Sequence, residues 1–348
     1  QEKYTPVIPP QHTQKGMIHM KKIRLGQIGI GHNHGEGKMR AARKFPELFE
    51  IVGYAEPNEE WIKKRGGLDC YSDLARMSEE ELLERCDAVL VETDVPYLTE
   101  TAKRCIDRGV HVHIDKPASG TLEEYAKLLE TAKKKNLTVQ LGYMYRYNHA
   151  VKKCIDMIKS GKLGEIYKID AEMSTYHPDG YRQWLSKYQG GSMYIFGSHL
   201  IDLIVTILGE PRNVVPFIKH TGFHGVESDD NCVAVLDYPR ATAVVTNLSV
   251  EVNGWGMRRF AVFGSLGTVE IKPIECDVRM TASLDPTVNA YEDIHTDIEV
   301  ADVPQNTRYD DMLRDFYLSV VGEKPNPYSY EHELAVQRVL LKSCAFHN

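Results

Sequence analysis

The stretch IRLGQIGIGHNHG, residues 23–35, decides the fold of the first half of the chain. An apolar run leads into a glycine-rich turn, and residues 38–44 then turn helical, which together predict a strand, a tight turn and a helix. Gly29 and Gly31 allow the tight turn and let the main chain approach a pyrophosphate, whose charge then lies against the amides at the helix start. The stretch therefore predicts a dinucleotide-binding unit.

One position of this glycine motif departs from the usual pattern. His34 stands where GxGxxG has its third glycine, so either the helix lies farther from the strand or Gly35 takes over the close packing. The residues of this turn that we expect against the cofactor are Gly29, Ile30, Gly31, His32, Asn33 and His34.

A second predicted strand, residues 51–55, ends at Glu56, roughly 20 to 25 residues after the glycines, the usual spacing for a ribose-binding acidic residue. A carboxylate at this position accepts hydrogen bonds from the ribose diol and repels a 2′-phosphate. No arginine adjoins Glu56 in the sequence to receive such a phosphate. We therefore expect NAD as the cofactor in preference to NADP.

Further strands and helices alternate, at residues 88–92, 97–108, 111–114, 122–135 and 137–142. This alternation implies parallel strands joined by right-handed crossovers, and thus an α/β Rossmann domain with a doubly wound sheet over residues 21–142. Ligands bind at the carboxyl edge of such a sheet. Besides the glycine turn and Glu56, the residues predicted near the cofactor at this edge are Thr93, Asp94, Asp115 and Lys116.

Lys116 lies in HVHIDKPAS, residues 111–119, where a predicted buried strand is followed by the charged residues Asp115 and Lys116. Pro117 stops the strand, because proline cannot donate to a strand ladder and holds its predecessor extended. The lysine is thereby fixed where it can face a cofactor on one side and a substrate on the other. An ordinary surface lysine in a turn is the alternative, and the other polar residues at the same edge favour the functional interpretation.

After Gly142 strands follow one another without helices between them, for example at 233–238, 242–250 and 259–263, with a hairpin turn at 264–268. This pattern predicts an antiparallel sheet in an α+β domain. Helical patterns then close the chain at about residues 309–321 and 330–344. The predicted division is an arm or expression remnant over 1–20, the Rossmann domain over 21–142, and a substrate-binding and oligomerisation domain over 143–348.

Composition limits the class of protein. The chain has 348 residues, 42% hydrophobic and 26% charged, with a net charge of −7, which is typical of a globular protein and argues against nucleic-acid binding. No apolar run approaches the roughly 20 residues that span a bilayer. The seven cysteines are scattered without a CxxC pair, which indicates a reducing compartment, so we expect a cytoplasmic protein with no membrane partner.

A second group of candidate residues lies in the apolar helix that follows Gly190 and Gly191. This helix carries only two reactive side chains, His199 and Asp202, which share a face at spacing i, i+3. A hydrogen-bonded pair in the core is the alternative.

Two histidine pairs, at 32/34 and 111/113, have the spacing of metal ligands. Because no thiolates cluster with them in the sequence, we expect no metal site. We expect the first pair to lie against the cofactor phosphates.

Taken together, these features resemble the Gfo/Idh/MocA family of oxidoreductases, named after glucose-fructose oxidoreductase and inositol dehydrogenase. The resemblance covers nearly all of residues 21–345 and rests on GIGHNHG, Glu56, DKP as a variant of EKP, GYMYRYN at 142–148, the GG…H…D helix and GSLGTVE. It implies an open-faced sheet that pairs sister subunits into a homodimer or homotetramer. It also implies NAD(P)-dependent interconversion of a secondary hydroxyl and a ketone on a sugar or cyclitol.

The resemblance assigns the family's catalytic lysine to Lys116, its histidine to His199 and its substrate-contacting aspartate to Asp202. The family's usual catalytic aspartate, four residues before the histidine, is Ile195 here. Either Asp202 replaces it or His199 works with a lower pKa. GYMYRYN and the GGSM…GSHLIDL helix further resemble a branch implicated in oxidising the 3-hydroxyl of glucosides.

We expect His199 to accept the hydroxyl proton and Lys116 to stabilise the developing alkoxide, although Lys116 itself is an alternative base. The side chains expected to contact a polyol are Tyr145, Arg146, Arg182, Trp184 and Asp202. Two other functions stay open: an enzyme that recycles bound NAD while oxidising a glycoside transiently, to allow cleavage or epimerisation, and a catalytically silent sugar- or NAD-sensing regulator.

Overall fold

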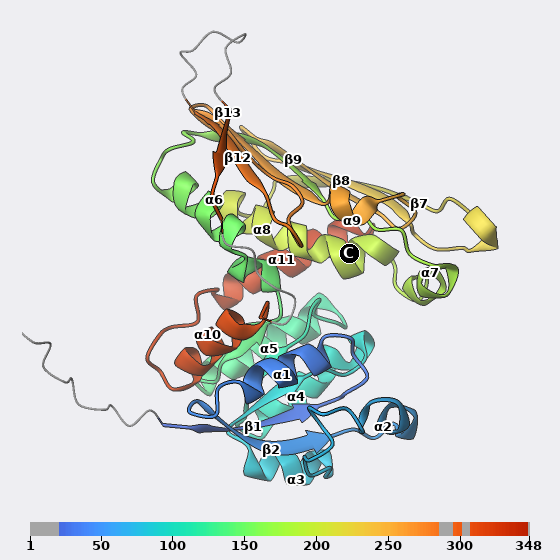
Figure 1. Cartoon of the computed structure of the whole chain (residues 1–348), viewed down its shortest axis with the longest axis vertical. Helices are drawn as coiled ribbons and strands as arrows, with labels where there is room; N and C mark the ends of the chain where they lie inside the picture. Colours follow the sequence, from blue (N-terminus) through green and yellow to red (C-terminus); the bar gives the residue numbers. More distant parts are fainter. Residues whose placement is uncertain (1–20, 285–294, 301–306, 347–348) are drawn as a thin grey trace, which may run out of the picture.

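The structure is a computed structural model that describes residues 21–284, 295–300 and 307–346, so the arm predicted at 1–20 lies outside the described residues. The described chain folds around two sheets, with the first domain below the second in Figure 1. None of its helices is long and apolar enough to cross a membrane.

The first sheet is parallel and has the strand order β2-β1-β3-β4-β5. Its strands are β1 (Ile23–Ile28), β2 (Phe49–Ala55), β3 (Ala88–Val91), β4 (His111–Ile114) and β5 (Val139–Leu141). The central strand β3 reads AVLV and is buried at every position, as parallel strands covered on both faces require. The order reverses between β1 and β3, and this switch point is where doubly wound sheets bind ligands.

Five α-helices connect these strands: α1 (Gly35–Arg43), α2 (Glu59–Arg65), α3 (Glu79–Arg85), α4 (Leu98–Asp107) and α5 (Leu122–Lys134). Helices α3 and α5 each begin with a capping box, in which a serine or threonine and the glutamate three residues later satisfy main-chain donors reciprocally. Helices α1 and α3 lie on opposite faces of the sheet (Figure 1). The expected Rossmann fold is confirmed.

The glycine turn between β1 and α1 is packed too closely for larger residues. Gly29 has φ +88°, and a Cβ there would lie 2.5 Å from the main-chain oxygen of Glu92. At Gly35 a Cβ would lie 3.0 Å from Gln27 Nε2 on β1. Gly35, rather than position 34, therefore provides the close contact between helix and strand.

The second sheet has the order β13-β12-β11-β10-β6-β9-β8-β7. Its strands are β6 (Ile166–Glu172), β7 (Asn213–Lys219), β8 (Asn231–Asp237), β9 (Thr242–Leu248), β10 (Arg259–Gly264), β11 (Gly267–Ile271), β12 (Met280–Leu284) and β13 (His295–Ile298). All neighbouring pairs are antiparallel except β6 and β9, which are parallel. The predicted hairpin at 264–268 joins β10 to β11.

Helices cover only one face of this sheet (Figure 1). The covering helices are α6 (His149–Lys159), α8 (Ser198–Leu208) and α11 (Tyr330–Ser343), with the short helices α7 (Asp179–Leu185) and α9 (Gly254–Met257) at one end. On the opposite face Val215 and Phe217 of β7 are 41% and 50% exposed. The sheet is therefore open-faced, as the family resemblance implies.

The C-terminal helices return to the first domain. Helix α10 (Asp310–Val320) packs against α1, and its Phe316 contacts the ring of His113 on β4 at a centroid distance of 5.9 Å. The Tyr317 hydroxyl donates to the main-chain oxygen of Lys21 at 3.0 Å. Helix α11 spans both domains, because it packs on α8 and on α5. Residues after 307 thus hold the two domains together.

Candidate active site

A cavity of about 340 Å³ lies at the switch point of the first sheet. Its lining includes the glycine turn, the end of β2, the end of β3 and one aromatic ring, namely Gly29, Gly31, Glu56, Thr93, Asp94 and Trp61. The hydroxyl oxygen of Thr93 is buried and has no hydrogen-bond partner in the described part of the chain. A buried hydroxyl without a partner indicates a position that a ligand satisfies.

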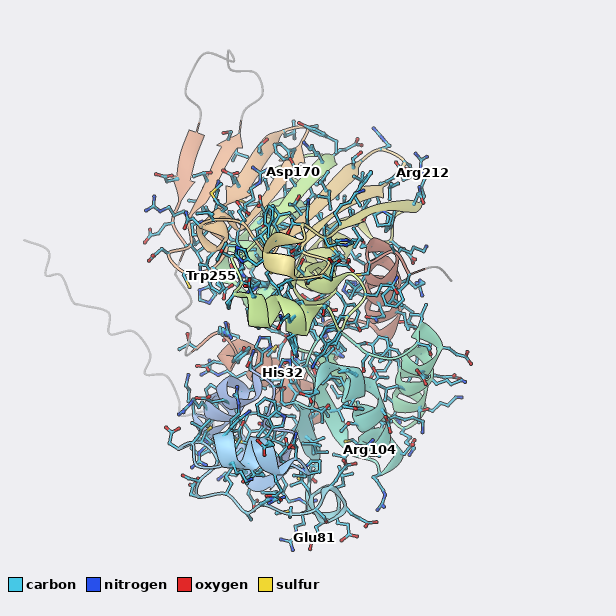
Figure 2. The ribbon with its side chains drawn as sticks, turned by 90° about the vertical axis from the view of Figure 1, so that its right-hand side faces the viewer. His32, Glu81, Arg104, Asp170, Arg212 and Trp255 are labelled. Carbon is cyan, nitrogen blue, oxygen red and sulfur yellow. The ribbon has the colours of Figure 1, made fainter. Side chains whose placement is uncertain are left out.

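A second cavity, of about 230 Å³, lies between the two domains. The first domain contributes His32, Asn33, His34 and Lys116, and the second contributes Tyr181, Trp184, Ile195 and Phe196. The two cavities share Gly31, Trp61 and Asp94, so they form one continuous cleft. Figure 2 places His32 at the level where the two domains meet.

The residues of this cleft fit a dinucleotide. A Cβ at Gly31 would lie 2.4 Å from the Trp61 ring, so only glycine leaves the turn clear. The Glu56 carboxylate accepts the main-chain N–H groups of Ile30 at 2.9 Å and Asn58 at 2.8 Å, which fixes it beside the turn. Ile30 was also predicted near the cofactor, and its side chain packs in a hydrophobic cluster.

One arginine near Glu56 was not expected from the sequence. Arg76 donates to the main-chain oxygen of Glu56 at 3.1 Å and pairs with the Glu59 carboxylate at 2.6 Å. The guanidinium is therefore close to the ribose-binding position, although its charge is already balanced.

Lys116 reaches the cleft from the end of β4. Its side chain is buried, and Nζ donates to the main-chain oxygen of Ile195 at 2.8 Å. Burial lowers the pKa of the Lys116 amine to about 8. A lysine with this pKa is close to the protonation balance that proton-transfer groups need near neutral pH.

The acceptor for Lys116 comes from an irregular helix. Residues Met193–Gly197 form a π-helical turn that runs directly into α8. Such turns leave the usual i→i−4 ladder and occur often at functional sites. At Ile195, where the family has its aspartate, the main-chain oxygen rather than an acidic side chain contacts the lysine.

His199 lies on the first turn of α8, buried against the edges of the Tyr143 and Tyr145 rings. Burial, and next the charge of Lys116, hold the pKa of His199 well below its usual range, so the imidazole is neutral at physiological pH. The Nδ1 atom has no hydrogen-bond partner among the described residues. His199 is not among the cleft-lining residues, so the structure brings Lys116, but not His199, to the cleft surface.

A charged cluster, of which the sequence analysis missed Lys38 and Glu92, lies behind the glycine turn. Lys38 of α1 is fully buried and pairs with Glu92 at 2.7 Å, while Asp115 pairs with His32 at 2.6 Å and His34 at 2.9 Å. Burial raises the pKa of Glu92. Burial also opposes ionisation of Asp115, but His32 and Lys38 hold its pKa well below the usual range. The position of Glu92 directly after β3, at the same edge as Glu56 and Asp115, was the available signal.

Arg146 and Asp202, which we expected at the substrate, lie in a buried ion-pair network. Arg146 pairs with Asp202 and, at 2.7 Å, with Glu333 of α11, and all three side chains are 1% exposed. The Arg146 guanidinium also stacks on the Tyr328 ring at 3.6 Å. Asp202 contacts Arg146 and His332, and in the described part of the chain no hydrogen bond or ion pair joins it to His199, so it does not replace the family aspartate. These side chains form a buried structural network.

Of the remaining substrate candidates, two make internal contacts and one lines the cleft. Arg182 is buried and pairs with Asp230 at 2.6 Å, and the Tyr145 hydroxyl donates to Glu275, so both also support the fold. Trp184, in contrast, lines the cleft and packs against Tyr181 at a centroid distance of 5.2 Å.

A substitution separates the structural role of Arg146 from substrate binding. We expect Arg146→Met to lower the free energy of unfolding by about 3–5 kcal/mol, because two buried carboxylates lose their guanidinium partner. Urea denaturation measures this loss. Arg212→Met is the matched control, since Arg212 pairs with Asp237 at a site 63% exposed and far from His32 (Figure 2), and we expect it to cost at most about 1 kcal/mol. Unchanged stability with a raised KM would contradict the structural role.

Comparison with known proteins agrees with this architecture. The family model described as "Oxidoreductase family, NAD-binding Rossmann fold" matches residues 23–143, and the model for the GFO/IDH/MocA C-terminal domain matches residues 151–270. Among solved structures, an oxidoreductase from Thermotoga maritima superposes with a TM-score of 0.76 at 22% identity, covering 93% of this chain and 96% of that one.

Two curated relatives match part of the chain. The Escherichia coli oxidoreductase YhhX is 30% identical over 52% of this chain and 51% of its own length. The Bacillus subtilis scyllo-inositol 2-dehydrogenase (NADP(+)) IolW is 27% identical over 48% of each chain. The two family models together match more than half of the chain and meet at the boundary between its two sheets. The chain therefore belongs to the Gfo/Idh/MocA family of oxidoreductases, with an NAD(P)-binding Rossmann domain.

Proposed function

We propose that this chain is an NAD-dependent dehydrogenase that interconverts a secondary hydroxyl and a ketone on a sugar, glycoside or cyclitol. The observation that carries the proposal is the position of Lys116, whose amine lines the cleft where the glycine turn meets the second domain. The substrate named for IolW is a cyclitol, which supports this class. The resemblance of residues 142–148 to a glucoside-oxidising branch favours the 3-hydroxyl of a glucoside.

In this proposal Lys116 contacts the reacting oxygen. One of its N–H groups is used by the Ile195 carbonyl, which fixes the amine, and two remain for the substrate hydroxyl. As the hydroxyl proton leaves, the ammonium stabilises the negative charge that develops on oxygen. We assign the acceptance of that proton to the neutral His199 imidazole, which lies behind the cleft surface, and the Lys116 amine on that surface is the alternative acceptor. A bound nicotinamide supplies the acceptor for the hydride from the carbinol carbon.

The second domain supplies a surface suited to a sugar ring. Tyr181, Trp184 and Phe196 line the cleft opposite the glycine turn, and His177 stacks on Tyr181 and Phe196 at centroid distances of 4.4 and 5.1 Å. Rigid aromatic faces provide large apolar contact area at low entropic cost, while the polar groups that fix orientation are few. The first domain provides those polar groups through Lys116 and Asp94.

The proposal is tested by removing Lys116 and His199 in turn. We expect Lys116→Met and His199→Asn each to lower kcat/KM by at least about 100-fold, because the first loses the group that holds the reacting oxygen and the second loses the assigned proton acceptor. Reduction of NAD would be followed by absorbance with monosaccharides, inositols and aryl glucosides. NADH binding, measured by fluorescence titration, should change little in either variant.

Lys127→Met is the matched control, because this lysine is exposed on α5, where it pairs with Glu123. Turnover by either active-site variant at the parent rate would disprove the mechanism. If the parent reduced NAD with none of these substrates, a sensing function would become the better proposal. Tightly bound nicotinamide released only on denaturation would indicate a recycled cofactor.

The choice of NAD rests on the Glu56 carboxylate. Hydrogen bonds to a charged group are worth about 1.5–3 kcal/mol, so we expect Glu56→Gln to lower the ratio of kcat/KM for NAD to that for NADP by about tenfold or more. Glu60→Gln, at an exposed position of α2, is the control. A parent enzyme that prefers NADP, as IolW is named to use, would assign the 2′-phosphate to Arg76 instead.

We also infer that the open face of the second sheet joins copies of this chain. Val215 and Phe217 are exposed there, beside Val233 and Val235 of β8 in the register of the sheet. An exposed apolar face of this kind marks an interaction surface. Light scattering of the full chain at micromolar concentration should give a dimer or tetramer, and Phe217→Lys should lower the mass. Val252→Lys, at an exposed position outside the strands, should not. A monomeric parent would contradict this inference.

A further inference from the structure

We propose that His32, His34 and Asp115 bind a divalent transition-metal ion beside the cleft. Nδ1 of each imidazole and one carboxylate oxygen of Asp115 converge, and the ligand atoms of the three residues lie within 4.8 Å of one another. His32 Nδ1 is 2.6 Å and His34 Nδ1 is 2.9 Å from the same atom, Asp115 Oδ2. This inference does not rest on the proposed function, because its test measures metal binding.

In each carboxylate of the cluster, the two oxygens have different partners. Glu92 Oε1 accepts from Lys38 Nζ at 2.7 Å, and Asp115 Oδ1 accepts the main-chain N–H of Lys116 at 2.6 Å. The second oxygens, Asp115 Oδ2 and Glu92 Oε2, face the histidines instead. Glu92 Oε2 lies 3.8 Å from His32 Nδ1, is buried, and has no hydrogen-bond partner among the described residues. A buried carboxylate oxygen without a donor is costly, and it marks Glu92 as an additional ligand.

His32 Nδ1 and the Asp115 carboxylate lie close together. The nitrogen is 2.6 Å from Asp115 Oδ2, and the main-chain N–H of His34 lies 3.2 Å from the same nitrogen. Either a proton on Nδ1 or a metal ion accounts for the short distance to the carboxylate. Only the metal ion also takes the lone pair of the second imidazole and gives the unpartnered Glu92 Oε2 a positive charge to bind.

The donor set indicates the class of ion. Two imidazoles with one or two carboxylates suit Zn²⁺, Co²⁺, Fe²⁺ or Mn²⁺, whereas Mg²⁺ and Ca²⁺ prefer oxygen ligands alone. His32 and His34 also line the same cavity as Lys116. Coordination positions that the protein leaves open are therefore accessible to an oxygen atom of water or of a substrate in the cleft. The structure thus gives a role to a histidine pair for which the sequence predicted no metal.

The experiment is a titration of the metal-free full chain with Co²⁺, followed through its visible absorption bands. We expect one cobalt per chain, displaced by Zn²⁺, in the parent protein. His34→Ala and Asp115→Asn should each weaken cobalt binding by at least about tenfold. His220→Ala, at an exposed site paired with Glu227, is the matched control and should bind like the parent.

Thermal unfolding of each variant checks that it is folded. If a variant does not fold, X-ray absorption of the cobalt-loaded parent decides: scattering from two imidazoles supports the site, and a shell without imidazole overturns it. Absence of visible bands in the parent, or unchanged binding in both folded variants, would also overturn the proposal. Either result would mean that a shared proton, rather than a metal, holds the cluster together.

Discussion

Two carboxylates buried at the carboxyl edge of the first sheet, Glu92 and Asp115, are the constraint on which the site depends. An unpaired buried ion costs several kcal/mol, so each needs a partner that arrives with the fold. Lys38 meets Glu92 from the first turns of α1, and the imidazoles of the glycine turn meet Asp115. The same contacts tie α1 to β3 and β4. The turn that faces the cofactor is therefore held from behind by charge, as well as by the close packing of its glycines.

The second domain fixes the other side of the cleft through main-chain geometry. Lys116 belongs to the first domain, but the acceptor that holds its amine is the carbonyl of Ile195 in the π-helical turn before α8. Helix α8, which continues this turn, is anchored by Arg146, which links the segment after β5 to Asp202 of α8 and Glu333 of α11. Removing one partner would leave buried charge, so this network keeps the lysine and the aromatic wall in a constant relation.

The sequence predicted what depends on strand ends and failed where partners are distant. Glu56, Thr93 and Lys116 were predictable because parallel strands end at one edge, which brings residues far apart in the chain together. Arg146 was assigned to the substrate because the forked donors of a guanidinium suit a polyol, but they suit a buried carboxylate equally well. Its partner Glu333 lies 187 positions away, and no local pattern relates the two. The π-helical turn was also missed, since MYIFG continues the apolar pattern of an α-helix.

The two departures from the family's motifs in the first domain are one structural feature. A histidine at position 34 places a ring where the fingerprint has no side chain, and this is tolerated because Gly35 takes the close contact with β1. An aspartate at position 115, one methylene shorter than the usual glutamate, keeps its carboxylate beside the strand end, where the next main-chain N–H donates to it at 2.6 Å. The ring and the carboxylate then meet at 2.9 Å. His34, which replaces a glycine of the fingerprint, and Asp115, which replaces the glutamate of the EKP motif, are therefore partners in one contact.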